Sequence, residues 1–260
     1  MIPTAIVAGF LAGFFGIGGG LITIPLMVYI FKLYGIESYY IMHLAVGTSF
    51  SIIIPTALVS VYTHYKLKAV DFEVMKTYGV FVIVGVFGGT YFAATLNSKS
   101  LILIFGIILY LLSINFFLKN NEKNKVFNFT LLLRLVLGFV VGFVSSIMGI
   151  AGAIMNVPIL KFCGFPIKRA IGSAAFIGLF ISIFGSIGFV ISGIVLNVNL
   201  PMSLGFVNIP AFLIFIPITS LMARIGAKTV HKMDKSIINK LLGCLLIILA
   251  TRFIYEYLTL

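Results

Sequence analysis

The chain has 260 residues, of which 61% are hydrophobic and only 9% are charged. This composition excludes a soluble globular protein and indicates an integral membrane protein. The formal charge of +12 comes from Lys and Arg residues that are spread over short segments between apolar runs. Membrane topology explains such a distribution, so no nucleic-acid partner is predicted.

Apolar runs divide the sequence into about eight hydrophobic segments. Two of them, 2–31 and 131–160, are too long for a simple crossing, since 30 residues of straight helix rise about 45 Å and the hydrocarbon core is about 30 Å thick. The other six have about the 20 residues that a membrane-spanning helix needs. They are residues 43–62, 77–96, 100–118, 170–192, 203–223 and 237–257.

The first long run contains GIGGG at residues 16–20. Close helix packing explains a lone GxxxG pair, but each consecutive glycine weakens a helix by about 1 kcal/mol relative to alanine. We therefore expect a re-entrant hairpin of two half-length helices, 2–15 and 20–31, whose glycine-rich tip lies in the membrane. The second long run is expected to divide in the same way at SIMGIAGA, residues 146–153.

The two long runs are similar to each other. GFLAGFFGIGGGLITIPLM (9–27) aligns without a gap with GFVSSIMGIAGAIMNVPIL (142–160), at an offset of 133 residues. A second match sets AVGTS (45–49) against AIGSA (170–174), in the same order along the chain. Two copies of the same elements in the same order predict a duplication.

Charge indicates how the two copies lie in the membrane, because cytoplasmic loops collect Lys and Arg. If all eight runs cross, the eighteen basic residues divide ten against eight; if the two long runs are hairpins, they divide fifteen against three. We therefore predict an all-α integral membrane protein with two inverted structural repeats, each a re-entrant hairpin plus three transmembrane helices, and both termini outside. The first membrane repeat is 1–118, the cytoplasmic linker is 119–130, and the second membrane repeat is 131–260.

Two tips that enter from opposite faces are expected to meet near the midplane. The half-helices that begin at about Gly20 and Ala153 then direct their first N–H groups at the meeting point, and helix amino termini attract anions. A tight, packed turn with no ligand is the alternative. The candidate substrate-binding residues are Gly16, Gly18, Gly19, Gly20, Thr23, Thr48, Ser49, Gly149, Ala151, Gly152, Asn156 and Ser173.

The remaining polar residues predict no catalytic chemistry. The sequence has no HExxH or GxSxG motif and no acid pair within the spans, so an enzyme is not expected. Cys163 and Cys244 lack metal-site spacing, and no metal or cofactor is predicted. His43, His64 and His231 lie near the ends of predicted crossings, where interfacial solvation is expected and proton coupling is the alternative. A carboxylate-based proton pump is not expected, because the acidic residues lie in loops apart from Glu256, which is near the end of the last predicted span.

The paired signatures GIGGGLITIP and GIAGAIMNVP resemble those of the TauE/SafE family of sulfite exporters. AVGTS and AIGSA look like the family's second-helix pattern, and PITSLMARIGAKTVHKM (217–233) is similar to its region before the last helix. The resemblance implies a multi-pass protein of a prokaryotic cytoplasmic membrane, in contact with lipid, that moves a small anionic substrate such as sulfite, thiosulfate or an organosulfonate by alternating access. An anion channel of the same fold and a non-transporting membrane partner are the alternatives. The transport direction, the coupling ion and the oligomeric state stay open.

Overall fold

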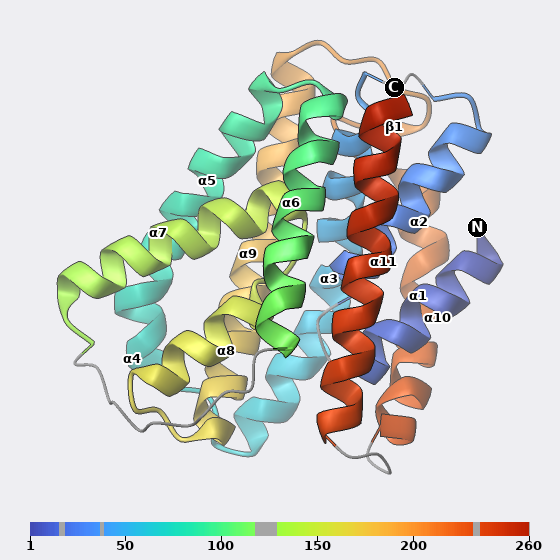
Figure 1. Cartoon of the computed structure of the whole chain (residues 1–260). Coiled ribbons are helices and arrows are strands. Elements are labelled where there is room, and N and C mark those ends of the chain that lie inside the picture. Colours follow the sequence, from blue (N-terminus) through green and yellow to red (C-terminus); the bar gives the residue numbers. More distant parts are fainter. Residues whose placement is uncertain (16–18, 37–38, 118–128, 231–234, 260) are drawn as a thin grey trace.

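The structure is a computed structural model that describes residues 1–15, 19–36, 39–117, 129–230 and 235–259 (Figure 1). The regular elements in these parts of the chain are helices, apart from one short antiparallel β-hairpin. The elements are α1 (Ile2–Phe15), α2 (Gly20–Leu33), α3 (Ile41–Lys66), α4 (Phe72–Val74), the π-helical turn η1 (Met75–Gly79), α5 (Val80–Thr95), α6 (Ser98–Phe117), α7 (Leu131–Met148), α8 (Ala153–Phe162), α9 (Ile167–Val195), β1 (Ser203–Leu204), β2 (Val207–Asn208), α10 (Ile209–Val230) and α11 (Lys235–Thr259).

Five of the described segments are long and apolar enough to cross a membrane. They are α3, the continuous segment from α4 to α5, α7, α9 and the part of α11 from Lys240. Shorter apolar stretches occupy α1, α2, α6, α8 and α10. The prediction of an all-α integral membrane protein is therefore confirmed.

The predicted crossing at 203–223 needs a correction at its start. Its first residues form β1 and β2, which pair Ser203 with Asn208, and the helix begins only at Ile209. Gly205 causes the difference, because its φ of +54° lies in the left-handed region that favours glycine and turns the chain back on itself. The apolar side chain of Phe206 is buried here and does not begin a crossing.

Each long run divides into two helices where the sequence predicts a break, although α7, with 18 residues, is itself long enough to cross a membrane. The expected half-helices 2–15 and 20–31 correspond to α1 and α2, and α8 begins at Ala153 as expected. In Figure 1 α2 runs from the middle of the molecule to the upper side, while α8 runs to the lower side. These opposite directions support inverted repeats, which stay a prediction.

The helices of the two halves pack on each other in a reciprocal way. Helix α1 packs along α10, and its repeat partner α7 packs along α5. Glycines at equivalent positions allow the close approach: a Cβ at Gly9 would lie 2.6 Å from Thr219 Cα, and one at Gly142 would overlap the carbonyl oxygen of Val82. Two copies of one structural unit would pack in this way, which supports the predicted duplication.

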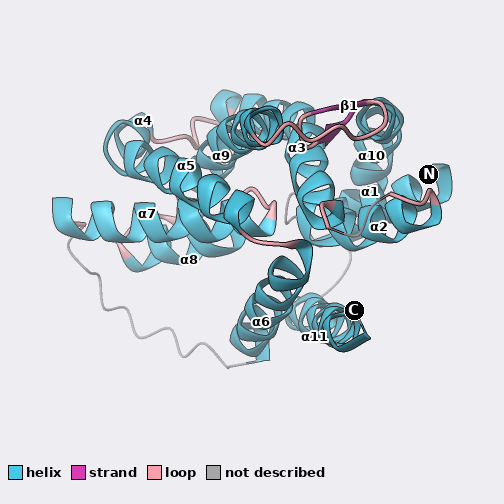
Figure 2. Cartoon of the chain, turned by 90° about the horizontal axis from the view of Figure 1, so that it is seen from above, coloured by secondary structure: helices cyan, strands magenta, loops and turns pink. Residues whose placement is uncertain are grey.

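Helices α6 and α11 form a pair at one side of the molecule (Figure 2). Phe105 and Phe253 pack between them with ring centroids 4.8 Å apart. An ion pair between Lys32 and Glu256 joins the end of α2 to α11. The pair is thereby connected to the first hairpin.

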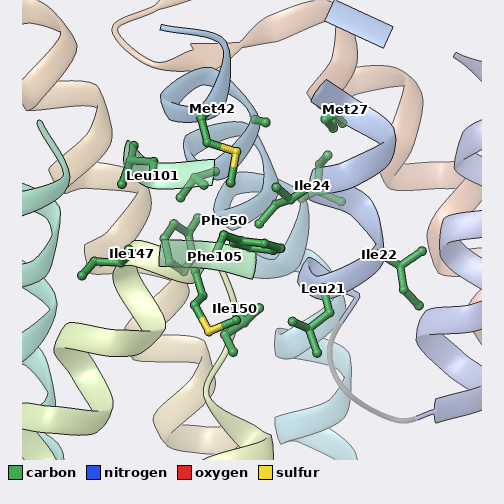
Figure 3. Close-up of a cluster of buried hydrophobic side chains, with 14 of the residues drawn as sticks. Leu21, Ile22, Ile24, Met27, Met42, Phe50, Leu101, Phe105, Ile147 and Ile150 are labelled. Carbon is green, nitrogen blue, oxygen red and sulfur yellow. The ribbon is translucent and has the colours of Figure 1, made fainter. Parts of the chain in front are cut away.

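A cluster of buried apolar side chains holds the second hairpin tip against α2, α3 and α6 (Figure 3). Leu21 and Ile24 come from α2, Phe50 from α3 and Phe105 from α6, and Ile150 belongs to the second tip. Within a membrane such a cluster is stabilised by van der Waals packing between helices, because lipid is as apolar as these side chains. The tips are therefore held in a packed interior.

Candidate functional site

The two hairpin tips meet, as the sequence predicts. A Cβ at Gly20, the first residue of α2, would overlap the carbonyl oxygen of Gly149 in the second tip and lie 3.0 Å from Ile150 Cγ2. The same carbonyl accepts a hydrogen bond from Ser49 Oγ of α3 at 3.2 Å. Gly20, Ser49 and Gly149, all predicted site residues, are thus brought together at one point.

Glycines in the left-handed conformation precede both half-helices. Gly19 has φ 81° and ψ −29°, and its repeat partner Gly152 has φ 67° and ψ 6°. The carbonyl of Gly19 accepts from the N–H groups of Ile22 and Thr23, and that of Gly152 accepts from those of Met155 and Asn156. The first two N–H groups of each helix have no partner within the helix, which makes both starts attractive to an anion.

A cavity of about 90 Å³ adjoins the first tip. Since a water molecule takes about 30 Å³ of liquid volume, the cavity has room for a ligand of a few heavy atoms. It lies beside the middle of α3 and of α10, which both run to the lower side of Figure 1. Its lining residues are Ala8, Gly19, Thr23, Ile52, Ile53, Thr56, Thr219 and Ala223.

Three threonine hydroxyls line this cavity, and each donates to a carbonyl of its own helix. Thr23 Oγ1 lies 2.9 Å from Gly19 O, Thr56 Oγ1 lies 2.8 Å from Ile53 O, and Thr219 Oγ1 lies 2.6 Å from Phe215 O. A hydroxyl rotates about its C–O bond, so it is able to donate to a ligand in place of the carbonyl. The cavity therefore offers neutral donors beside a helix amino terminus.

The second tip carries a different polar arrangement. Asn156, fully buried in α8, accepts a hydrogen bond at its Oδ1 from the Tyr78 hydroxyl at 2.8 Å. Its Nδ2 and the buried Ser145 Oγ have no hydrogen-bond partner within the described residues. A Cβ at Gly152 would lie 2.7 Å from Ser145 Oγ and 3.1 Å from Asn156 Nδ2, so both groups converge on the start of α8.

Other predicted site residues take different positions. Thr48 accepts from the backbone N–H of Asn208 at 2.9 Å, and Ser173 accepts from that of Asp71 at the same distance. Both hydroxyls therefore bind the loop that precedes a helix of the other half. Ala151 is buried against α9, where a Cβ at Gly178 would lie 2.7 Å from its carbonyl oxygen. The predicted residues Gly16 and Gly18 lie outside the described residues.

The expectation that the histidines are solvated at the interface is wrong for His43. Its side chain is fully buried, its Nε2 lies 2.9 Å from the carbonyl oxygen of Ala93, and its ring stacks on Phe206. The error arose because α3 begins at Ile41 under the β-hairpin, which covers the residues at its amino-terminal end. His64 is half-buried at the other end of α3, and His231 lies outside the described residues.

Sequence reasoning missed four residues near the tips: Thr56, Tyr78, Ser145 and Thr219. Thr56 and Thr219 come to the first tip from α3 and α10, and nothing in their local sequence indicates that contact. Ser145 aligns with Ala12 in the repeat, so comparison of the two copies hides it. A signal did exist for Tyr78, which is the polar-tipped aromatic residue at the start of an otherwise apolar run.

The fold and the two tips define a multi-span membrane protein with a polar centre. The model of the family "Sulfite exporter TauE/SafE" matches residues 1–253, so the chain belongs to the TauE/SafE family. A probable membrane transporter protein of Haemophilus influenzae is 32% identical over 244 residues, covering 94% of this chain and 92% of that protein. Another from Methanocaldococcus jannaschii is 30% identical over 257 residues, with 94% and 93% covered.

The Bacillus subtilis probable membrane transporter protein YunE is 26% identical over 276 residues, covering 98% of this chain and 97% of YunE. No solved structure gives a significant match to the chain. The family and these relatives support a role in membrane transport.

Proposed function

We propose that the protein carries a small sulfur-containing anion, such as sulfite, thiosulfate or an organosulfonate, across the cytoplasmic membrane of a prokaryote. The observation that carries the proposal is the contact of Gly20, the first residue of α2, with Gly149 in the second tip, together with a left-handed glycine directly before each of α2 and α8. Backbone N–H groups and helix dipoles at such starts attract anions, and broken helices hold substrates in other inverted-repeat transporters.

The surroundings of the tips suit an anion. Within the described parts of the chain, Glu256 is the one acidic side chain that is buried, and it is paired with Lys32 at the outer end of α11. The described polar groups at the tips are neutral hydroxyls and an amide. A buried carboxylate on the path would repel an anion strongly in a medium of low dielectric constant.

The two tips differ in a way that supports alternating access. The first tip adjoins the threonine-lined cavity. At the second tip, Ile181 takes the place that Thr56 has in the other repeat, and a Cβ at Gly152 would lie 2.9 Å from its Cδ1. One half is open beside its tip while the other is packed, and exchange of these two arrangements would move an anion past the contact.

The test is flux of radiolabelled sulfite, thiosulfate and methanesulfonate into proteoliposomes that contain wild-type protein, Thr23→Val or Thr219→Val. Each valine removes a cavity hydroxyl, and the Gly19 carbonyl that Thr23 releases still accepts from two backbone N–H groups. A hydrogen bond to a charged group contributes about 1.5–3 kcal/mol, so KM is expected to rise about 10- to 100-fold for the transported anion.

Thr63→Val is the matched control. Thr63 is exposed on α3 and makes the same bond to its own helix, at 2.9 Å from Val59 O, but lies outside the cavity. Its flux is expected to equal that of the wild type. Wild-type KM in both cavity variants would contradict an anion site at the first tip, and ion currents far above carrier turnover would favour a channel.

The orientation is part of the proposal: both termini outside and the linker in the cytoplasm. Lys32 and Lys66 end α2 and α3, which reach opposite sides of the molecule in Figure 1. A membrane-impermeant thiol reagent applied to whole cells is expected to label Lys32→Cys and to leave Lys66→Cys unlabelled, in a background without Cys163 and Cys244. The reverse pattern would contradict the orientation.

A further inference from the structure

The second tip contains two buried polar groups whose hydrogen-bonding capacity is unused within the described residues. Ser145 Oγ of α7 and Asn156 Nδ2 of α8 belong to side chains with 0% exposure. Their repeat partners differ in chemistry, because Ala12 stands opposite Ser145 and Thr23, which bonds to its own helix, stands opposite Asn156. Buried polar groups are nearly always paired, so an unpaired couple at one place indicates a functional requirement.

Both groups converge on the amino-terminal end of α8. A single point, the position that a Cβ would take on Gly152, lies 2.7 Å from Ser145 Oγ and 3.1 Å from Asn156 Nδ2. Gly152 is the residue that precedes α8, a helix of 10 residues whose first N–H groups face the same region. The helix start, the hydroxyl and the amide are therefore directed at one place, and all three are donors. Ile181 Cδ1 lies 2.9 Å from the same point, so a ligand enters only when this side chain moves aside, as the proposed exchange of the open and packed arrangements requires.

The orientation of the Asn156 amide is set by Tyr78. Tyr78 is fully buried in the π-helical turn η1, and its hydroxyl donates to Asn156 Oδ1 at 2.8 Å. Because the amide oxygen is occupied by this bond, the amide presents its N–H groups to the start of α8. Such π-helical turns occur often at functional sites.

We infer that Ser145 Oγ and Asn156 Nδ2, together with the first N–H groups of α8, form a second half of the anion site that receives the oxygens of a sulfur oxyanion. Tyr78 is its positioning residue. The inference rests on the proposed function. It adds two residues, Ser145 and Tyr78, to the proposed site, and it makes the second tip a stronger anion-binding site than the first tip. The second tip supplies donors that have no competing partner in the described structure, whereas the described hydroxyls of the first tip must leave a helix carbonyl to reach a ligand.

Ser145→Ala tests the half-site with little risk to the fold. The substitution removes a buried hydroxyl that lacks a partner within the described residues, so the unliganded protein is expected to be as stable as the wild type or more stable. Thermal unfolding of purified protein is followed while sodium sulfite, thiosulfate or methanesulfonate is titrated against sodium chloride of equal ionic strength. A ligand of the folded state raises the unfolding temperature until it saturates.

We expect one of the three anions to stabilise the wild type saturably, and Ser145→Ala to weaken its apparent affinity about tenfold. Ser146→Ala is the matched control. The neighbouring Ser146 is equally buried, but its hydroxyl donates to its own helix at Phe143 O, 2.8 Å away. Its variant is expected to bind the anion as the wild type does.

A double-mutant cycle tests the positioning role of Tyr78. Tyr78→Phe is expected to weaken anion binding about threefold to tenfold in the wild-type background and to have no further effect in Asn156→Ala, because it acts through that amide. A purely structural role predicts equal losses in both backgrounds. That result would overturn the role assigned to Tyr78.

Two outcomes would overturn the half-site itself. One is a wild type that none of the three anions stabilises, and the other is a Ser145→Ala protein that binds as tightly as the wild type. Flux into proteoliposomes judges the proposed function separately. Anion binding that depends on Ser145, in a protein that shows no flux, would support the half-site and contradict transport. Flux in a protein whose Ser145→Ala variant binds the anion unchanged would support transport and contradict the half-site.

Discussion

Replacement of Gly20 by alanine tests the contact between the two tips. Gly20 is the first residue of α2 and keeps an ordinary helical backbone, so alanine causes no backbone strain there. Its methyl group, however, would overlap the Gly149 carbonyl oxygen and lie 3.0 Å and 3.1 Å from two atoms of Ile150. Since the obstacle is backbone, the second tip must move away, and the bond from Ser49 to that carbonyl must lengthen from 3.2 Å.

Overpacking of this kind costs about 1–3 kcal/mol, and the weakened hydrogen bond adds about 1 kcal/mol. The better helix propensity of alanine offsets at most about 1 kcal/mol. We therefore expect a net loss of about 1–3 kcal/mol, measured as a lower unfolding temperature in detergent, together with reduced anion flux. Displacement of the tips is the physical cause of both effects.

Gly88→Ala is the matched control. Gly88 lies inside α5, and the nearest atoms to its added Cβ, in Phe139, are 3.6 Å away, an ordinary van der Waals distance. This variant is expected to be as stable as the wild type or more stable, because alanine favours the helix. If Gly20→Ala unfolds and transports like Gly88→Ala, the described contact between the tips is refuted.

Two further predictions concern the second tip and the ion pair between Lys32 and Glu256. Gly152→Ala is expected to lose about 1–2 kcal/mol of stability in thermal unfolding because Gly152 has a φ of +67°. The variant is also expected to lose anion binding, since its methyl group would lie 2.7 Å from Ser145 Oγ. Unaltered binding would count against the half-site. Lys32→Glu is expected to lower the free energy of unfolding by about 1 kcal/mol, a modest value because Lys32 is 37% exposed. Addition of Glu256→Lys is expected to restore stability. A double variant as unstable as the single one would show that the ion pair contributes nothing.

The sequence was sufficient to predict the two hairpins. Consecutive glycines at 16–20, an apolar run too long for one crossing and a second copy of the same pattern all indicated a break, and α2 and α8 begin at the expected residues. These signals are local in the chain. Local patterns of this kind predict where helices begin, end and break.

Contacts between distant segments could not be predicted in the same way. Asn156 was expected beside the tip from its alignment with Thr23, but its bond to Tyr78 joins residues 78 positions apart. Thr48 was expected at the tips together with Ser49, as a donor on a neighbouring helix, yet its hydroxyl binds Asn208, 160 positions away. Adjacent residues of a helix point about 100° apart, so which of them faces a site depends on the packing of the whole helix.

For the charged residues too, a pattern along the sequence was informative, while contacts between distant segments could not be predicted. The asymmetry of Lys and Arg favoured hairpins over straight crossings, and both long runs are divided into two helices. It gave no indication that Lys32 pairs with Glu256, because that contact depends on how the end of α2 meets α11. The burial of His43 under the β-hairpin was hidden for the same reason.

The measurement that tests the central claim most directly is flux of radiolabelled sulfite, thiosulfate and methanesulfonate into proteoliposomes, with and without a pH gradient. We predict saturable flux of at least one of these anions by the wild type, a higher KM in both Thr23→Val and Asn156→Ala, and no change in Thr63→Val. Dependence on the gradient would show proton coupling. No flux above that of empty liposomes for any of the three anions, or equal flux in all variants, would contradict an anion path through the paired tips.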